Sequence, residues 1–117
     1  MSDWHDIGTV EDIPRLGARV VQSPQGNIAV FRTAEDEIFA LRDRCPHKAG
    51  PLSQGIVHGK RVTCPLHSWT LELGTGEAIA PDVGCAARFP VKVEGGRILL
   101  QVSAVAAVSD HSAGTLA

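Results

Sequence analysis

The sequence of 117 residues has no apolar run that approaches the roughly 18–20 residues needed to cross a bilayer. Its opening residues 1–6 are polar and lack a basic region followed by an apolar one, so we expect no export signal. The formal net charge is only −2, which gives no reason to expect nucleic acid or an anionic membrane as a partner. We therefore expect a cytoplasmic protein that binds neither nucleic acid nor membrane.

Helical patterns are also missing. No segment shows a convincing apolar period of about 3.6 residues, and no glycine-rich phosphate loop opens a helix. The length predicts one domain with one modest core. Short apolar stretches with frequent turns between them predict an all-β fold, an antiparallel sandwich or small barrel.

The expected strands form hairpins. The clearest pairs residues 91–94 with residues 97–102 across Gly95-Gly96. Two further hairpins and three single strands are expected from apolar alternation and turn residues: 17–22 with 28–33, 56–58 with 61–63, and strands at 4–7, 37–42 and 69–73. The strand at 37–42 alternates, with Ile38 and Ala40 on one side and Phe39 and Leu41 on the other.

Cysteine is scarce, with three residues, but two of them stand close to histidines. Cys45 and His47 lie in the segment CPHKAGPL (residues 45–52, the first loop). Cys64 and His67 lie in CPLHSW (residues 64–69, the second loop), and sixteen residues separate His47 from Cys64. The third cysteine, Cys85, has no partner at ligand spacing, and we expect it to be a small buried residue in a reducing compartment.

Two thiolates and two imidazoles are the ligand set of a Rieske [2Fe–2S] centre, in which two histidines replace two cysteines on one iron. Neutral imidazoles remove negative charge from the cluster, so that it accepts an electron more easily. We predict that Cys45, His47, Cys64 and His67 bind one such cluster. Each loop would supply one ligand to each iron.

Three other interpretations stay open. A structural zinc site uses the same kind of ligand set, although the Cys-x-His spacing is tighter than in zinc fingers and no helix pattern carries the histidines. A disulfide between Cys45 and Cys64 is disfavoured without a secretory signal. Coincidence is disfavoured because the two motifs match each other.

The sequence resembles the Rieske family and, within it, the small subunit of assimilatory NAD(P)H-dependent nitrite reductase. The segments that carry this resemblance are 4–8, 45–57, 74–78 and 81–85, and the resemblance covers roughly residues 4–102. It implies a fold of stacked antiparallel sheets, with a small cluster-binding subdomain that bears both loops.

The resemblance also implies a large partner subunit with FAD, a [4Fe–4S] cluster and sirohaem, which reduces nitrite to ammonium in nitrate assimilation. This chain would be the oxidoreductase subunit that transfers electrons, without catalytic residues of its own. One alternative is a free-standing Rieske ferredoxin of an aromatic-ring dioxygenase system. Another is a zinc-stabilised interaction module without redox chemistry.

Rieske proteins of high potential have a disulfide beside the cluster and hydroxyl side chains that donate to its sulfurs. The family's disulfide positions are Gly50 and Leu66 here, and its serine and tyrosine positions are Trp69 and Leu71. Fewer hydrogen bonds stabilise the reduced cluster less. We therefore expect a potential near the low end of the Rieske range, around −150 mV.

Two surface features complete the expectations. Residues 103–117 are rich in Ala and Ser, and we expect them to be disordered or, alternatively, a weak partner-binding extension. Basic residues flank the two loops and would form either a basic rim that guides an acidic partner or an ordinary solvated face: Arg42, Arg44, Lys48, Lys60 and Arg61.

Overall fold

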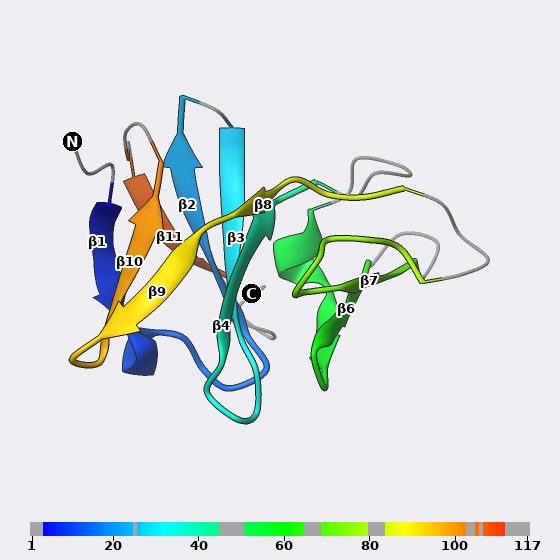
Figure 1. The fold of residues 1–117 in the computed structure, drawn as a ribbon, viewed down its shortest axis with the longest axis horizontal. Coiled ribbons are helices and arrows are strands. Elements are labelled where there is room, and N and C mark those ends of the chain that lie inside the picture. The colour runs from blue at the N-terminus through cyan, green and yellow to red at the C-terminus, as the bar shows by residue number, and fades with distance from the viewer. Residues whose placement is uncertain are drawn as a thin grey trace.

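The chain folds into antiparallel β-sheets (Figure 1). The computed structural model describes residues 4–24, 26–44, 51–64, 69–79, 84–102, 105 and 107–111. Within them the helical elements are two short 3-10 helices, η1 (Val10–Asp12) and η2 (Leu52–Gln54). No helix in these ranges has the length and hydropathy that a membrane span requires. The expected all-β class is confirmed.

The strands fall into three sheets. They are β1 (Trp4–Thr9), β2 (Ala18–Ser23), β3 (Gly26–Arg32), β4 (Ile38–Arg42), β5 (Ile56–His58), β6 (Arg61–Thr63), β7 (Thr70–Glu72), β8 (Arg88–Phe89), β9 (Val91–Glu94), β10 (Arg97–Gln101) and β11 (Ala107–His111). The five-stranded sheet has the order β11-β2-β3-β4-β8, and the two three-stranded sheets have the orders β1-β10-β9 and β5-β6-β7.

The three predicted hairpins are confirmed. Glu94 pairs with Arg97 across the two glycines, whose φ angles are +58° and +82°. These left-handed values are the reason why glycine suits this turn. His58 pairs with Arg61 in the β5–β6 hairpin. The β2–β3 hairpin is longer than predicted, because β3 already begins at Gly26.

The five-stranded sheet is apolar on both faces. On β3, Ala29 and Phe31 join a core shared with β5–β7, which we name the subdomain core. Ile28 and Val30 join a second core shared with β1 and β10, which we name the sandwich core. Because side chains alternate along a strand, one short apolar run serves both cores. The predicted alternation on β4 is confirmed in the same way, with Leu41 in the subdomain core and Ala40 in the sandwich core.

The expectation of a disordered tail over residues 103–117 is wrong for residues 107–111. These form β11, which pairs antiparallel with β2 from Ala107 opposite Gln22 to His111 opposite Ala18. Pairing satisfies backbone groups at the edge of β2 and needs no bulky side chains, so a composition of small residues does not prevent it. Apart from residue 105, the rest of the tail lies outside the described residues.

Candidate metal centre

Among the four predicted ligands, the structure describes Cys64. This cysteine directly follows β6 and is only 1% exposed, in the subdomain core with Leu52, Val62 and Leu71. Cys45, His47 and His67 lie outside the described residues. Residues that flank these positions are described, and they define how each loop leaves the fold. The expectation that Cys85 is buried is wrong, because Cys85 is exposed and lies opposite the exposed Glu77 in an isolated β-bridge.

The second loop is closed at its base by a backbone hydrogen bond. The N–H of Cys64 donates to the carbonyl oxygen of Trp69 over 2.6 Å. One step further into the sheet, Thr63 pairs with Thr70 in the β6–β7 ladder, and their hydroxyl oxygens are 3.0 Å apart. The loop therefore begins and ends at neighbouring points of one short hairpin.

The first loop is closed by a carboxylate. Asp43 follows β4, and its two carboxylate oxygens accept from the backbone N–H of Ser53 over 2.6 Å and from the Ser53 hydroxyl over 2.8 Å. Ser53 lies in η2 and is 5% exposed. The backbone N–H of Asp43 in turn donates to Asn27 O over 2.8 Å. This arrangement ties the loop's two ends together and to the five-stranded sheet.

The bases of the two loops lie side by side. Ile56, just after η2, pairs with Thr63, just before Cys64. Gly55 comes so close to this strand that a β-carbon there would lie 2.3 Å from the carbonyl oxygen of Thr63. Figure 1 shows η2 beside β6 and β7, next to the end of β4. Two segments far apart in sequence thus leave the fold at one place.

The described residues fit a [2Fe–2S] cluster at this place. A cysteine in an apolar, water-excluded position is suited to hold a metal as a thiolate that solvent does not reach. Around it, Leu71 is fully buried and Trp69 packs against the subdomain core. Neither of these side chains has a hydroxyl group that could donate to the sulfur. The fold therefore supplies a sulfur donor and an apolar surrounding where both loops emerge.

Residues 3–90 match the family model of the Rieske [2Fe-2S] domain. The chain belongs to the Rieske family. A Rieske domain carries one [2Fe–2S] cluster, which accepts and passes on one electron at a time. The expected cofactor is thereby confirmed, and this Rieske chain is an electron-transfer component of oxidoreductase chemistry.

The known proteins that this chain is similar to include dioxygenase ferredoxins by sequence and further Rieske chains by fold. The ferredoxin component of the naphthalene 1,2-dioxygenase/salicylate 5-hydroxylase systems of Ralstonia sp is 32% identical over 101 residues, covering 86% of this Rieske chain and 96% of the relative. The ferredoxin of carbazole 1,9a-dioxygenase from Nocardioides aromaticivorans IC177 has a TM-score of 0.76 at 24% identity, covering 85% and 97% of the two chains. A protein described as an NADH-dependent nitrite reductase small subunit from Mycobacterium tuberculosis has a TM-score of 0.76 at 19% identity, covering 86% and 95%.

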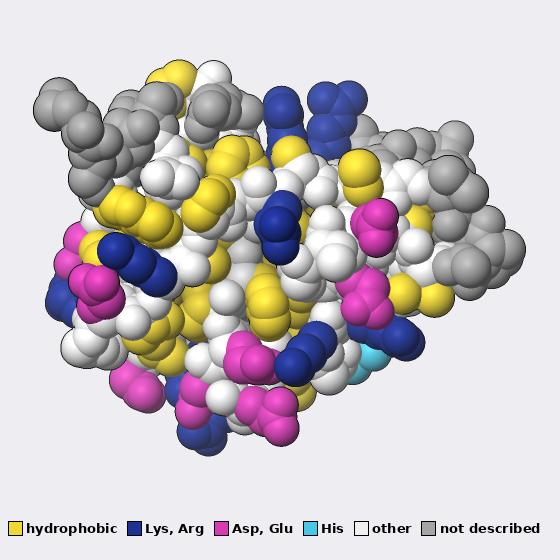
Figure 2. Space-filling model, viewed as in Figure 1, with side chains coloured by type: hydrophobic (Ala, Val, Ile, Leu, Met, Phe, Trp, Pro, Cys, Tyr) yellow, Lys and Arg dark blue, Asp and Glu magenta, His cyan; other side chains and the backbone are white. Residues whose placement is uncertain are grey.

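Two of the five basic residues that flank the loops of this Rieske chain have carboxylate partners. Lys60 lies 3.4 Å from a carboxylate oxygen of Glu37, and Arg61 lies 3.3 Å from one of Glu72. Figure 2 shows Lys and Arg side chains next to Asp and Glu side chains on this part of the surface. Within the described ranges Arg42 and Arg44 are exposed and have no ion pair, whereas Lys48 falls outside them.

Arg32, at the end of β3, is the most deeply buried charged side chain of the described residues, with 5% exposed. It was not among the residues singled out from the sequence. Its guanidinium donates to Ile13 O over 2.7 Å and to Asp36 over 2.8 Å. Hydrogen bonds from Arg15 and then Arg32 lower the pKa of Asp36 to about 2. An arginine that ends an apolar strand, with an aspartate four residues later, is the signal that could have revealed this network.

Proposed function

We propose that this chain is the Rieske ferredoxin of an aromatic-ring oxygenase system, a carrier that delivers single electrons to the oxygenase. One observation carries this proposal: a dioxygenase ferredoxin is 32% identical to the chain and is matched over 96% of its own length. The similarity thus extends across the whole carrier. It favours the ferredoxin over the nitrite reductase small subunit that the sequence motifs suggested first.

The proposed ligands are Cys45 and His47 from the first loop and Cys64 and His67 from the second. Cys64 is placed by β6 and by the bond from its N–H to Trp69, so its side chain starts from a fixed backbone. Asp43 plays the matching part for the first loop through its two bonds to Ser53. The chain's own contribution to electron transfer is then to hold both loops together and keep water from the sulfur side.

Arg42 and Arg44 are proposed to orient the partner. Both are exposed, both precede the first loop directly, and neither has an ion pair within the described residues. Exposed charges of one sign beside a redox centre raise the rate at which an oppositely charged partner docks. A partner with acidic side chains around its docking site is therefore expected.

A second candidate is the small subunit of an NAD(P)H-dependent nitrite reductase. It is supported by the motif resemblance and by the shared fold of the Mycobacterium tuberculosis protein, with a TM-score of 0.76. In that role the chain would remain bound to a large subunit with FAD, a [4Fe–4S] cluster and sirohaem. A ferredoxin instead meets its partners transiently.

Gentle affinity purification from the native host distinguishes the two candidates. As a ferredoxin, the chain is expected to elute without a stoichiometric partner, and in the reduced state to be reoxidised by an aromatic-ring oxygenase supplied with its substrate and oxygen. Changing Arg42 and Arg44 to Glu should slow this reoxidation, whereas changing the paired Arg61 to Glu should slow it less. Co-purification of one sirohaem protein per chain would overturn the ferredoxin proposal in favour of the nitrite reductase subunit.

A further inference from the structure

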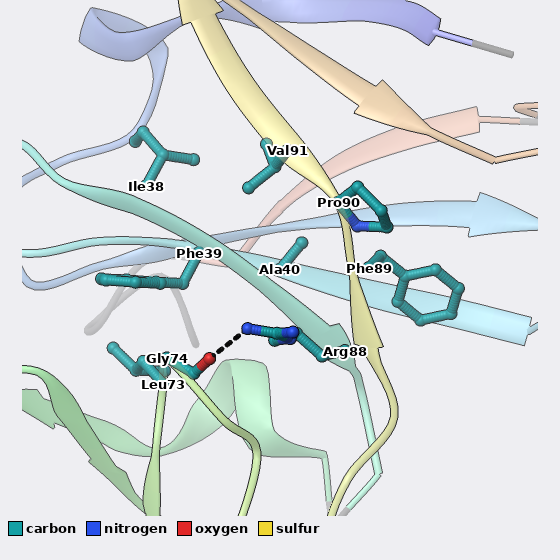
Figure 3. A pocket seen from close by; sticks show the side chains of 9 residues that line it. All are labelled: Ile38, Phe39, Ala40, Leu73, Gly74, Arg88, Phe89, Pro90 and Val91. Carbon is teal, nitrogen blue, oxygen red and sulfur yellow. Dashed lines mark hydrogen bonds between the residues drawn. The ribbon is translucent and has the colours of Figure 1, made fainter.

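A cleft of about 370 Å³ lies at the junction between the five-stranded sheet and the turn after β7 (Figure 3). Phe39 and Leu73 line one side of it, and Phe89, Pro90 and Val91 line the other. These walls are apolar. On the face drawn in Figure 2, hydrophobic side chains gather over β4 and β9, the strands that border the cleft.

One cation lies among these apolar walls. Figure 3 places the guanidinium of Arg88 between the lining side chains, where it donates one hydrogen bond to Gly74 O over 2.6 Å. A guanidinium has five N–H donors, and within the described residues no carboxylate forms an ion pair with Arg88. The cleft therefore combines the Phe39 ring and aliphatic walls with an exposed guanidinium whose other N–H groups are open to a ligand.

We propose that this cleft binds a small organic acid with one carboxylate and an aromatic or branched apolar body. The carboxylate would accept hydrogen bonds from the free N–H groups of Arg88, whose planar shape suits bidentate contact with a carboxylate. The apolar body would lie between Phe39, Leu73 and Val91. The cleft's volume of about 370 Å³ falls within the usual range for small-molecule sites.

Occupancy of the cleft would have a structural consequence. Phe39 packs against the subdomain core, while Ile38 and Val91 pack against the sandwich core. A ligand in the cleft contacts both groups and the turn that follows β7. Binding to the folded state alone would raise the thermal midpoint of the whole chain. This inference does not depend on which oxidoreductase the chain serves.

The test is an NMR titration of the cluster-loaded protein with benzoate, with benzyl alcohol as a neutral probe of similar size. Benzoate is expected to cause saturable shifts of the amide signals of Phe39, Gly74 and Arg88 and to raise the thermal midpoint. Arg88→Gln should weaken benzoate binding at least tenfold, as expected for loss of charge-assisted hydrogen bonds. Arg61→Gln, which removes an exposed arginine that does not line the cleft, should leave binding unchanged.

A second variant covers the case in which Arg88→Gln disturbs folding by losing its bond to Gly74. A β-carbon at Gly74 would meet only the Phe39 ring, at 3.9 Å, so a side chain fits there and extends into the cleft. Gly74→Leu keeps the guanidinium and should still block benzoate. The proposal is overturned by equal binding of benzoate and benzyl alcohol, by unchanged binding in both variants, or by the absence of saturable shifts at millimolar benzoate.

Discussion

Asp36 shows how a single residue links local backbone geometry to charge. Its φ of +67° lies in the left-handed region, which Asp and Asn tolerate better than most residues. In this position its carboxylate accepts hydrogen bonds from Arg15 and Arg32. These bonds hold the pKa of Asp36 at about 2, below the ordinary value of 3.8.

The lowered pKa of Asp36 predicts an acid-dependent loss of stability. A carboxylate with a lower pKa in the folded state stabilises the fold above pH 4, and this contribution is lost as the pH falls towards about 2. Wild type should therefore unfold at higher urea than Asp36→Asn at pH 6, and the two midpoints should converge between pH 4 and 2. Asn tolerates the left-handed backbone as Asp does, so Asp36→Asn removes the charge without straining the chain. A midpoint difference that stays constant over this range would contradict the assignment.

The proposed ligands make a second prediction about single residues. Replacing Cys45 or Cys64 by Ser, or His47 or His67 by Ala, should remove iron and acid-labile sulfide, because each iron then lacks a donor. His58→Ala is the matched control. His58 is exposed and 2.8 Å from the hydroxyl of Thr63, outside the ligand set. Full iron content in any of the four ligand variants would remove that residue from the set.

At the scale of elements, the carboxylate that closes the first loop should govern how well the cluster is retained. Asp43→Ala leaves the buried N–H of Ser53 without its acceptor, and we expect the free energy of unfolding to fall by about 2 kcal/mol. Ser53→Ala loses only the side-chain bond and should cost about 1 kcal/mol. Loss of visible absorption in the presence of an iron chelator should accelerate in the same order. If Asp43→Ala loses its visible absorption at the wild-type rate, retention of the cluster does not depend on the hydrogen bonds between Asp43 and Ser53.

Close contact between the bases of the two loops gives a further prediction. The φ of Gly55 is −79°, which any residue can adopt, so a side chain is excluded by crowding, above all by the 2.3 Å approach to Thr63 O. Gly55→Ala should therefore separate β5 from β6 and lower the free energy of unfolding by about 1–3 kcal/mol. Gly74→Ala, whose β-carbon would make an ordinary contact with the Phe39 ring at 3.9 Å, should change it by less than about 0.5 kcal/mol. Equal effects of the two variants in urea unfolding would contradict this view of Gly55.

Several elements were predictable because their signals are local. The Gly95-Gly96 pair predicts the hairpin around it, and the two-residue alternation of a strand places Leu41 and Ala40 on opposite faces of the sheet. The position of Cys64 at the end of a strand also follows from local pattern. In contrast, β8 is two residues long and exists through its pairing with β4. The hydrogen bond between Ser53 and Asp43 joins residues that are ten apart in sequence, on either side of the first loop. No periodic pattern in the sequence predicts such a contact.

At the scale of the whole molecule, the central sheet explains why a short chain can support a redox site. One face packs on the strands β1 and β10, and the other packs on the small sheet from which the second loop emerges. The loop bases are thus fixed to a core rather than suspended at the surface. Dioxygenase ferredoxins and nitrite reductase small subunits share this scaffold, with TM-scores of 0.76 to both. Fold alone therefore does not identify the partner, and the ferredoxin proposal rests on the sequence relative.

We propose that two thiolates and two imidazoles hold the cluster in an environment poor in hydrogen-bond donors. An EPR-monitored redox titration of the purified chain tests it most directly. We predict a rhombic signal in the reduced protein, with a midpoint around −150 mV, because histidine ligation raises the potential while Trp69 and Leu71 offer no hydroxyl to the sulfurs. A midpoint of about +200 mV or higher would contradict the donor-poor environment. A midpoint near −400 mV, typical of a cluster bound by four cysteines, or a protein with zinc and no signal would contradict the ligand set.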